Sequence, residues 1–310
     1  MKKLLGLLVI LFVIVLGWPY FFLPSSETLT ASMTMYAPAA RVYTLLAKQN
    51  EWSKWWPGQS ASQAASLEYN GNNYRVDAEV VNTIEIVIEQ KDSAIKSRIL
   101  VIMKTIDTCE LEWRVQVNRG SNPFKKIQYY FSDDTLKADM TSILHSFKKF
   151  VEKQETLYGM RIEKAQVTDT VLVATRRNFS HYPSTQEIYS LIEKLNNYIK
   201  TRNVSETNFP MLNIHQADSN LYNVMVAIPI SRSLIGKDNI ELKRMIPGKI
   251  IWGEVKGGPY SVEAAIKKLE NFRIDYHLTS PAIPFASLVT DRMKEPDTTK
   301  WITRVYYPIF

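Results

Sequence analysis

Residues 171–182 read VLVATRRNFSHY, and residues 249–260 read KIIWGEVKGGPY. Each stretch is an apolar run of strand-like composition that passes through polar or glycine residues and ends on a tyrosine. The two tyrosines, Tyr182 and Tyr260, are 78 positions apart. The sequence therefore contains one unit twice, and this duplication decides the fold of its second half.

The two stretches are followed by matching patterns. Apolar residues recur at helical spacing after each stretch, Ile188, Leu191, Ile192 and Leu195 after the first and Ala265, Ile266, Leu269 and Phe272 after the second. Each copy then closes on a strand that ends in Pro-Ile, VAIPI at 226–230 and VYYPI at 305–309, an offset of 79 positions. Two βαββ units predict one domain at 160–310, with repeats at about 168–230 and 245–310 related by a pseudo-twofold axis. We expect its helices on one face of a sheet and a cleft on the other.

This repeat, with GKIIWGEVKGGPY at 248–260 and the terminal WITRVYYPIF, resembles the gyrase-inhibitor-like family, also called the AraC-type effector-binding domain. The resemblance implies a groove between the repeats that takes small, often cationic or amphipathic, molecules. Many members carry a glutamate on the penultimate strand, inside a Phe-Glu-hydrophobic-Tyr stretch, and some relatives use such an acid for hydrolysis. The corresponding stretch here is Phe285-Ala286-Ser287-Leu288, so the sequence departs from the family at the acid on which cation recognition and hydrolysis would depend.

The remaining acid in the first strand of the second repeat is Glu254. It lies two residues from Trp252 and therefore on the same face of a strand. A buried cation needs a carboxylate or an aromatic face as its partner. We therefore predict ligand contacts from Trp252 and Glu254, with Tyr260, Tyr182 and Tyr307 as walls of the groove. The alternative is a solvated Glu254 on an edge strand, with the aromatic residues in the core.

The first half of the chain has the pattern of an α+β domain at residues 27–157. A strand at 27–35 is followed by a short helix, several β-rich runs between 74 and 117, and a long helical pattern at about 133–156. The segment TASMTMYAPAARVYTLLAKQNEWSKWWPG, at 30–58, resembles the opening of the START-like or polyketide-cyclase-like (SRPBCC) superfamily. The resemblance implies a helix-grip fold with an apolar cavity between the sheet and the last helix. Four tryptophans, Trp52, Trp55, Trp56 and Trp113, are candidates for the cavity mouth or, alternatively, for ordinary packing.

The N-terminus predicts a membrane anchor at 1–26. After Lys2 and Lys3, residues 4–23 contain no charged side chain. This uncharged stretch is just long enough for a transmembrane helix. The alternative is a cleaved signal peptide. The two lysines predict a cytoplasmic N-terminus, so we expect a bacterial single-pass membrane protein with periplasmic or extracellular domains.

Composition narrows the choice of partners. The chain has 310 residues, with 38 Lys and Arg against 31 Asp and Glu, a net charge of +7 that first suggests nucleic acid. Its basic residues are spread along the chain. A regulator with this kind of effector-binding domain normally has a helix-turn-helix before it, but here the predicted anchor and START-like domain occupy that position. We therefore expect no nucleic-acid partner. The lone Cys109 excludes disulfides within the chain, and four scattered histidines (His145, His181, His215, His277) show no metal spacing, so no metal or cofactor is predicted.

The sequence thus predicts an α+β fold made of an N-terminal transmembrane helix, a helix-grip START-like domain and a duplicated βαββ effector-binding domain. The predicted function is that of a membrane-anchored, non-catalytic binding protein for small hydrophobic or amphipathic ligands, in envelope sensing, sequestration or transfer. No catalytic residue is predicted. The alternatives are a hydrolase with Glu254 as general base, or an interaction module that has lost ligand binding.

Overall fold

The computed structural model describes residues 25–58, 66–91, 93–118, 120, 123–280 and 282–310. The chain divides between Lys153 and Gln154 into two compact units, and each is described by itself. Residues 154–157, placed in the first domain by the sequence pattern, belong to the second unit.

The first unit is built on a six-stranded antiparallel sheet in the order β1-β6-β5-β4-β3-β2. Its strands are β1 (Ser26–Met35), β2 (Leu67–Tyr69), β3 (Asn72–Val80), β4 (Thr83–Gln90), β5 (Ser93–Thr105) and β6 (Thr108–Asn118). Asn70 and Gly71 connect β2 to β3, and both have positive φ, 49° and 80°. An Asn-Gly pair suits this two-residue hairpin because it adopts the left-handed conformation at little cost.

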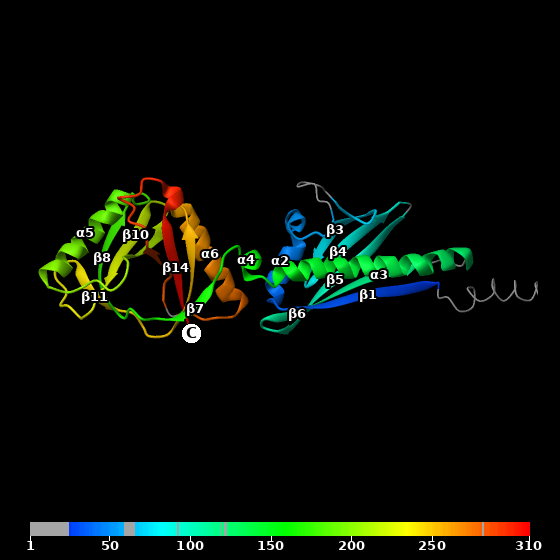
Figure 1. Ribbon diagram of the computed structural model, residues 1–310, viewed down its shortest axis with the longest axis horizontal. Helices are drawn as coiled ribbons and strands as arrows, with labels where there is room; N and C mark the ends of the chain where they lie inside the picture. Colours follow the sequence, from blue (N-terminus) through cyan, green and yellow to red (C-terminus); the bar gives the residue numbers. More distant parts are fainter. Residues whose placement is uncertain (1–24, 59–65, 92, 119, 121–122, 281) are drawn as a thin grey trace, which may run out of the picture. The chain divides into compact units, whose positions relative to one another are not determined.

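Three helices accompany this sheet: α2 (Ala39–Ala47), the 3-10 turn η1 (Gln49–Lys54) and α3 (Pro123–Val151). Figure 1 shows α3 running along β1. Near its C-terminal end, Lys148 donates from Nζ to the Thr34 carbonyl at 2.8 Å. The buried side of α3 repeats at helical spacing through Leu136, Met140, Ile143, Leu144 and Phe147. This apolar stripe packs on the alternating inward residues of the strands.

The fold class and localisation predicted from the sequence require correction. In the part of the chain that the structure describes, no helix is long and apolar enough to span a membrane. The 29 residues of α3 are sufficient in number, but charged residues occur along its length. The predicted transmembrane helix at 4–23 lies outside the described residues. The described residues give a mixed α+β fold with two antiparallel sheets, in place of the predicted fold class that included a transmembrane helix.

The second unit is built on an eight-stranded antiparallel sheet in the order β11-β8-β10-β9-β13-β14-β12-β7. Its elements are α4 (Gln154–Tyr158), β7 (Glu163–Gln166), β8 (Val171–Phe179), α5 (Thr185–Thr201), β9 (Met211–Asp218), β10 (Leu221–Pro229), β11 (Ile240–Arg244), β12 (Lys249–Lys256), α6 (Pro259–Asp275), β13 (Phe285–Leu288), η2 (Thr298–Lys300) and β14 (Ile302–Ile309). The segments β8-α5-β9-β10 and β12-α6-β13-β14 repeat one order of elements. They meet where β9 pairs with β13, through Leu212 opposite Ala286 and Met211 opposite Ser287.

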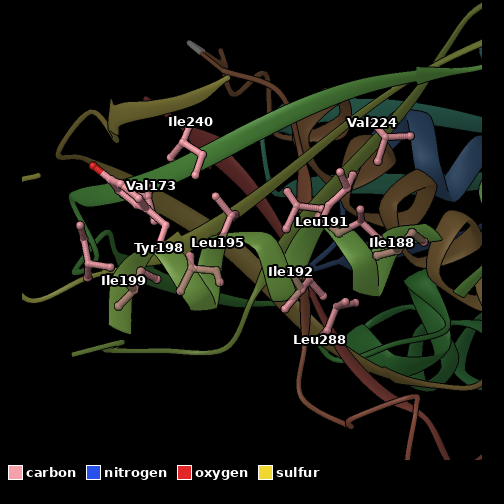
Figure 2. Close-up of a cluster of buried hydrophobic side chains, with 14 of the residues drawn as sticks. Val173, Ile188, Leu191, Ile192, Leu195, Tyr198, Ile199, Val224, Ile240 and Leu288 are labelled. Atoms are coloured by element: carbon pink, nitrogen blue, oxygen red, sulfur yellow. The ribbon is translucent and has the colours of Figure 1, made fainter. Parts of the chain in front are cut away.

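The two faces of this sheet have different surroundings. On the helix face, the apolar stripe of α5 packs on Val173, Val224 and Val226, as Figure 2 shows in part. The capping box of Ser184 and Glu187 begins this helix. A separate cluster that includes Leu172, Met211 and Phe285 lies on the opposite face, which we call the open face. Side chains alternate along each strand, so neighbouring residues separate onto these two faces.

Gly253 in β12 offers a test of this packing. A Cβ atom there would lie 2.8 Å from the Arg161 carbonyl oxygen and would also meet the Met160 side chain. Because a backbone carbonyl cannot easily move away, we expect Gly253→Ala to destabilise the protein by about 1–3 kcal/mol. Calorimetric unfolding would measure this loss. Gly248→Ala is the matched control, since its added Cβ meets no atom within 4 Å, and equal losses in both variants would contradict the packing described.

Candidate functional site

The four tryptophans considered for a cavity mouth in the first unit are all buried. Their exposed fractions are 1% for Trp52, 4% for Trp55, 7% for Trp56 and 0% for Trp113. The rings of the first three lie against one another, with centroids 5.3–5.7 Å apart. The Trp52 indole donates to the Leu46 carbonyl at 2.8 Å. These side chains therefore pack as part of the core of the first unit.

A cavity of about 530 Å³ lies against the same sheet, and none of the four tryptophans lines it. The start of β1, the end of β4, the start of β5 and the end of β6 form its walls with one residue of α3. Its lining includes Ser26, Gln90, Ile95, Lys96, Val117 and Leu136. The volume lies in the range of about 300–1,000 Å³ that is common for small-molecule sites.

In the second unit, three aromatic rings from three adjacent strands form a row across the open face. Tyr306 of β14 is the register partner of both Trp252 in β12 and Phe285 in β13. The ring centroids of Trp252 and Tyr306 are 6.1 Å apart with an interplanar angle of 23°, and those of Tyr306 and Phe285 are 5.0 Å apart at 12°. We call these three residues the aromatic row. Phe285 is buried, whereas Trp252 and Tyr306 are only partly buried.

Glu254 is next to this row, but its carboxylate already has a partner. Arg304 donates from Nε to Glu254 Oε2 at 3.2 Å, and its guanidinium carbon lies 5.5 Å from the ring centroid of Trp252. The Glu254 side chain is 49% exposed. The carboxylate of Glu254 is therefore half exposed and paired with one guanidinium.

The pKa of the Tyr306 hydroxyl depends on the charges around the aromatic row. Burial raises its pKa, Arg304 opposes that rise, and the carboxylates of Asp169 and Glu254 add to it. Asp169 is held in place by Asn208, which donates from Nδ2 at 2.9 Å. The open face thus combines aromatic surface with nearby charges of both signs.

The structure does not bring the three predicted wall tyrosines to this face. Tyr307 lies on the opposite side of β14, where the Arg273 guanidinium of α6 is 5.5 Å from its ring centroid. Tyr182 packs edge-on against Tyr222, with centroids 5.8 Å apart. Burial raises the pKa of Tyr182, and the smaller electrostatic influences on it come from Arg292, Glu263, Tyr222 and Tyr260. Tyr182 and Tyr260 are therefore near each other, and Tyr260 is 89% exposed.

Sequence reasoning missed Arg304, Tyr306 and Phe285. Alternation in the terminal ITRVYYPI segment places Arg304 and Tyr306 on one strand face, but only the strand pairing places them beside Glu254 and Trp252. Ala286 occupies the position at which the resemblance implies a glutamate, and it does not lie on the open face. Ala286 pairs with Val305 and Leu212 on the helix face, whereas Phe285 belongs to the open-face cluster.

The described part of the chain shows neither a metal site nor an exposed cysteine. Within it, no group of three His, Cys, Asp or Glu side chains could hold a metal ion. His181 contacts Glu187 at 3.2 Å on the exposed surface near the start of α5. Burial raises the pKa of the Cys109 thiol to about 11, so the reactive thiolate form is disfavoured.

Comparisons with known proteins show distant structural similarity. No family model matches the chain, and no curated protein matches it. A structure of an EcmrR–DNA complex has a TM-score of 0.44 and 14% identity over 60% of this chain and 70% of that one. SAV2435 bound to tetraphenylphosphonium has a TM-score of 0.32 and 13% identity, covering 49% and 94% of the respective chains. The Zhui aromatase/cyclase from Streptomyces sp. R1128 has a TM-score of 0.31 and 11% identity, covering 42% and 97%. Similarities of this size carry no conclusion about activity.

The partners predicted from the sequence gain no support from these comparisons. The similar structures include one of an EcmrR–DNA complex, so the comparisons do not support the predicted absence of a nucleic-acid partner. The membrane partner depended on a spanning helix at 4–23, and the described residues contain no helix suited to that role.

The different settings of the tryptophans predict different effects on stability. We expect Trp52→Ala to cost about 3–5 kcal/mol, because it removes a fully buried ring and leaves a cavity. Trp252→Ala should cost clearly less, since Trp252 is only partly buried. Calorimetric unfolding of the two variants beside the wild type would compare them. An equal or larger loss in Trp252→Ala would show that the aromatic row is structural core.

Proposed function

We propose that this protein is a non-catalytic binding protein for small hydrophobic or amphipathic molecules, and that the open face of the second unit is its binding surface. The aromatic row is the observation that carries this proposal. Three rings lie in sequence across adjacent strands, and the α5 stripe packs on the other side of the sheet. A planar or apolar group can extend such a row by stacking, which contributes about 0.5–1.5 kcal/mol per ring pair beyond area burial.

The charged groups around the row favour an amphipathic ligand over a purely apolar one. Arg304 and Glu254 lie at the Trp252 end, and Asp169 acts on the hydroxyl of Tyr306. A ligand with both an apolar body and a polar or charged group would use both kinds of contact. Because Glu254 is paired with Arg304, a cationic group on the ligand would compete with that guanidinium.

The two alternatives have less support. The hydrolase alternative requires Glu254 as a free base, but the carboxylate is half exposed and accepts a hydrogen bond from Arg304. The alternative of an interaction module without ligand binding predicts a filled first unit, and that unit contains a cavity of about 530 Å³.

Binding to the aromatic row can be tested with tetraphenylphosphonium as a hydrophobic cationic probe. We expect it to raise the unfolding temperature of the wild type, because a ligand that binds only the folded state stabilises it. Loss of one stacking partner in Trp252→Ala should weaken binding roughly 2- to 10-fold in calorimetric titration.

Tyr260→Ala is the matched control, since it removes an exposed aromatic side chain of α6, outside the three strands that form the row. It should leave the affinity unchanged. Absence of binding to the wild type, or the same loss of affinity in Tyr260→Ala and Trp252→Ala, would contradict a binding surface at the aromatic row.

A further inference from the structure

The loop between β13 and η2 places a buried arginine on the helix face of the second unit. Arg292 is only 8% exposed, and its Nη2 donates to Thr303 Oγ1 at 2.9 Å. Thr303 is two residues from Val305 on β14 and therefore shares its face of the sheet. Nε of Arg292 is enclosed and has no hydrogen-bond partner among the described residues. Nη1 also forms no hydrogen bond with them, but unlike Nε it keeps access to solvent.

No carboxylate compensates the charge of this guanidinium. Arginine stays protonated in proteins, so Arg292 carries a positive charge at a buried position. Among the described residues it forms no ion pair, since the neighbouring Asp291 pairs with Lys294 at 3.1 Å. Burial lowers the pKa of Arg292, and the groups that oppose this effect are the hydroxyls of Tyr189 and Tyr182. Because an uncompensated buried charge is costly, an anion that binds there would lower the free energy of the folded protein.

Arg292 is linked to both of the repeat-related helices. Its backbone N–H donates to the hydroxyl of Tyr189 in α5 at 2.7 Å. Its guanidinium carbon is 4.6 Å from the ring centroid of Trp301, whose carbonyl accepts a hydrogen bond from Gly257 N at 2.9 Å, just before α6. The N-cap residue of α6, Gly258, has no side chain to cap the first turn. The positive end of this helix, which favours anions, is therefore only one residue, Trp301, away from the guanidinium.

The two duplicated tyrosines lie in the same region. Burial raises the pKa of Tyr182, and Arg292, Glu263 and Tyr260 all act on it as well. Tyr182 is 47% exposed and Tyr260 is 89% exposed, so both offer aromatic surface to solvent. Glu263 is exposed too, and its charge disfavours a ligand with more than one negative charge. A guanidinium without an anionic partner next to exposed rings has the composition of a site for an aromatic carboxylate.

We propose that Arg292, Tyr182 and Tyr260 bind a small aromatic carboxylate at the N-terminal ends of α5 and α6. The carboxylate would accept a hydrogen bond from Nη1 of Arg292, and its ring would lie on the exposed faces of the tyrosines. A neutral alcohol of the same shape leaves the guanidinium charge uncompensated. This site is on the helix face, so it does not depend on the function proposed for the open face.

Three probes test the proposal on the full chain: 2-naphthylacetate, 2-naphthylethanol and inorganic phosphate. In calorimetric titrations, we expect naphthylacetate to bind the wild type at least about tenfold more tightly than naphthylethanol, a difference that one charge-assisted hydrogen bond can supply. Phosphate should bind at least about tenfold more weakly than naphthylacetate, because it has no ring to stack. Arg292→Gln should lower the affinity for naphthylacetate to that for naphthylethanol. Lys294→Gln is the matched control, since it removes an equal but exposed charge from the same loop, and it should change the affinity less than about twofold.

Aromatic variants separate this site from the aromatic row. Tyr260→Ala should weaken naphthylacetate binding roughly 2- to 10-fold and leave tetraphenylphosphonium binding unchanged, whereas Trp252→Ala should do the reverse. Failure of one site is thereby distinguished from failure of the other. If Arg292→Gln does not fold, Tyr182→Ala tests the same site by removing a partly exposed ring, and it should also weaken naphthylacetate binding. The proposal is overturned by equal affinities for naphthylacetate and either other probe, by full affinity in folded Arg292→Gln or in Tyr182→Ala, or by equal losses in Arg292→Gln and Lys294→Gln.

Discussion

The pairing of β14 between β13 and β12 is the constraint on which the second unit depends. This register places Tyr306 between Phe285 and Trp252, and Arg304 opposite Glu254. The same pairing directs Val305 to the helix face, where it is fully buried. One strand therefore supplies both the core contact that holds α6 and the side chains that make the open face a candidate binding surface. A shift by one residue would exchange the two sets, because side chains alternate along a strand.

The two units use aromatic residues in opposite ways. In the first unit, Trp52, Trp55 and Trp56 are buried and pack against one another, and none of them lines the cavity. In the second unit, Trp252 and Tyr306 are stacked but remain partly exposed. Aromatic content alone therefore does not distinguish a packed core from a binding surface. The distinction comes from which face of the sheet is covered.

Charge shows the same dependence on surroundings. Glu254, the acid that the sequence pattern favoured, is half exposed and paired with Arg304. Asp139, within the long helical pattern of the first half, is nearly inaccessible and accepts a hydrogen bond from Asn70. Burial raises the pKa of Asp139, whereas the neighbouring Asn70 and Asn72 side chains lower it. The surroundings of Asp139 are assembled from a hairpin and a helix, since its partner Asn70 is 69 residues away in the sequence.

Local patterns in the sequence determined much of the architecture. The repeated strand and helix patterns around Tyr182 and Tyr260 predicted elements that the structure contains, because periodicity and turn residues act over short distances along the chain. The same reasoning placed Trp252 and Glu254 on one strand face, since that relation depends only on alternation. It failed for Tyr307, and it did not select Arg304, Phe285 or Asp139, because their neighbours come from distant segments. Strand order, register and the contact of Asn70 with α3 were decided by tertiary structure alone, since only folding brings their partners within the few ångströms over which hydrogen bonds, stacking and burial act.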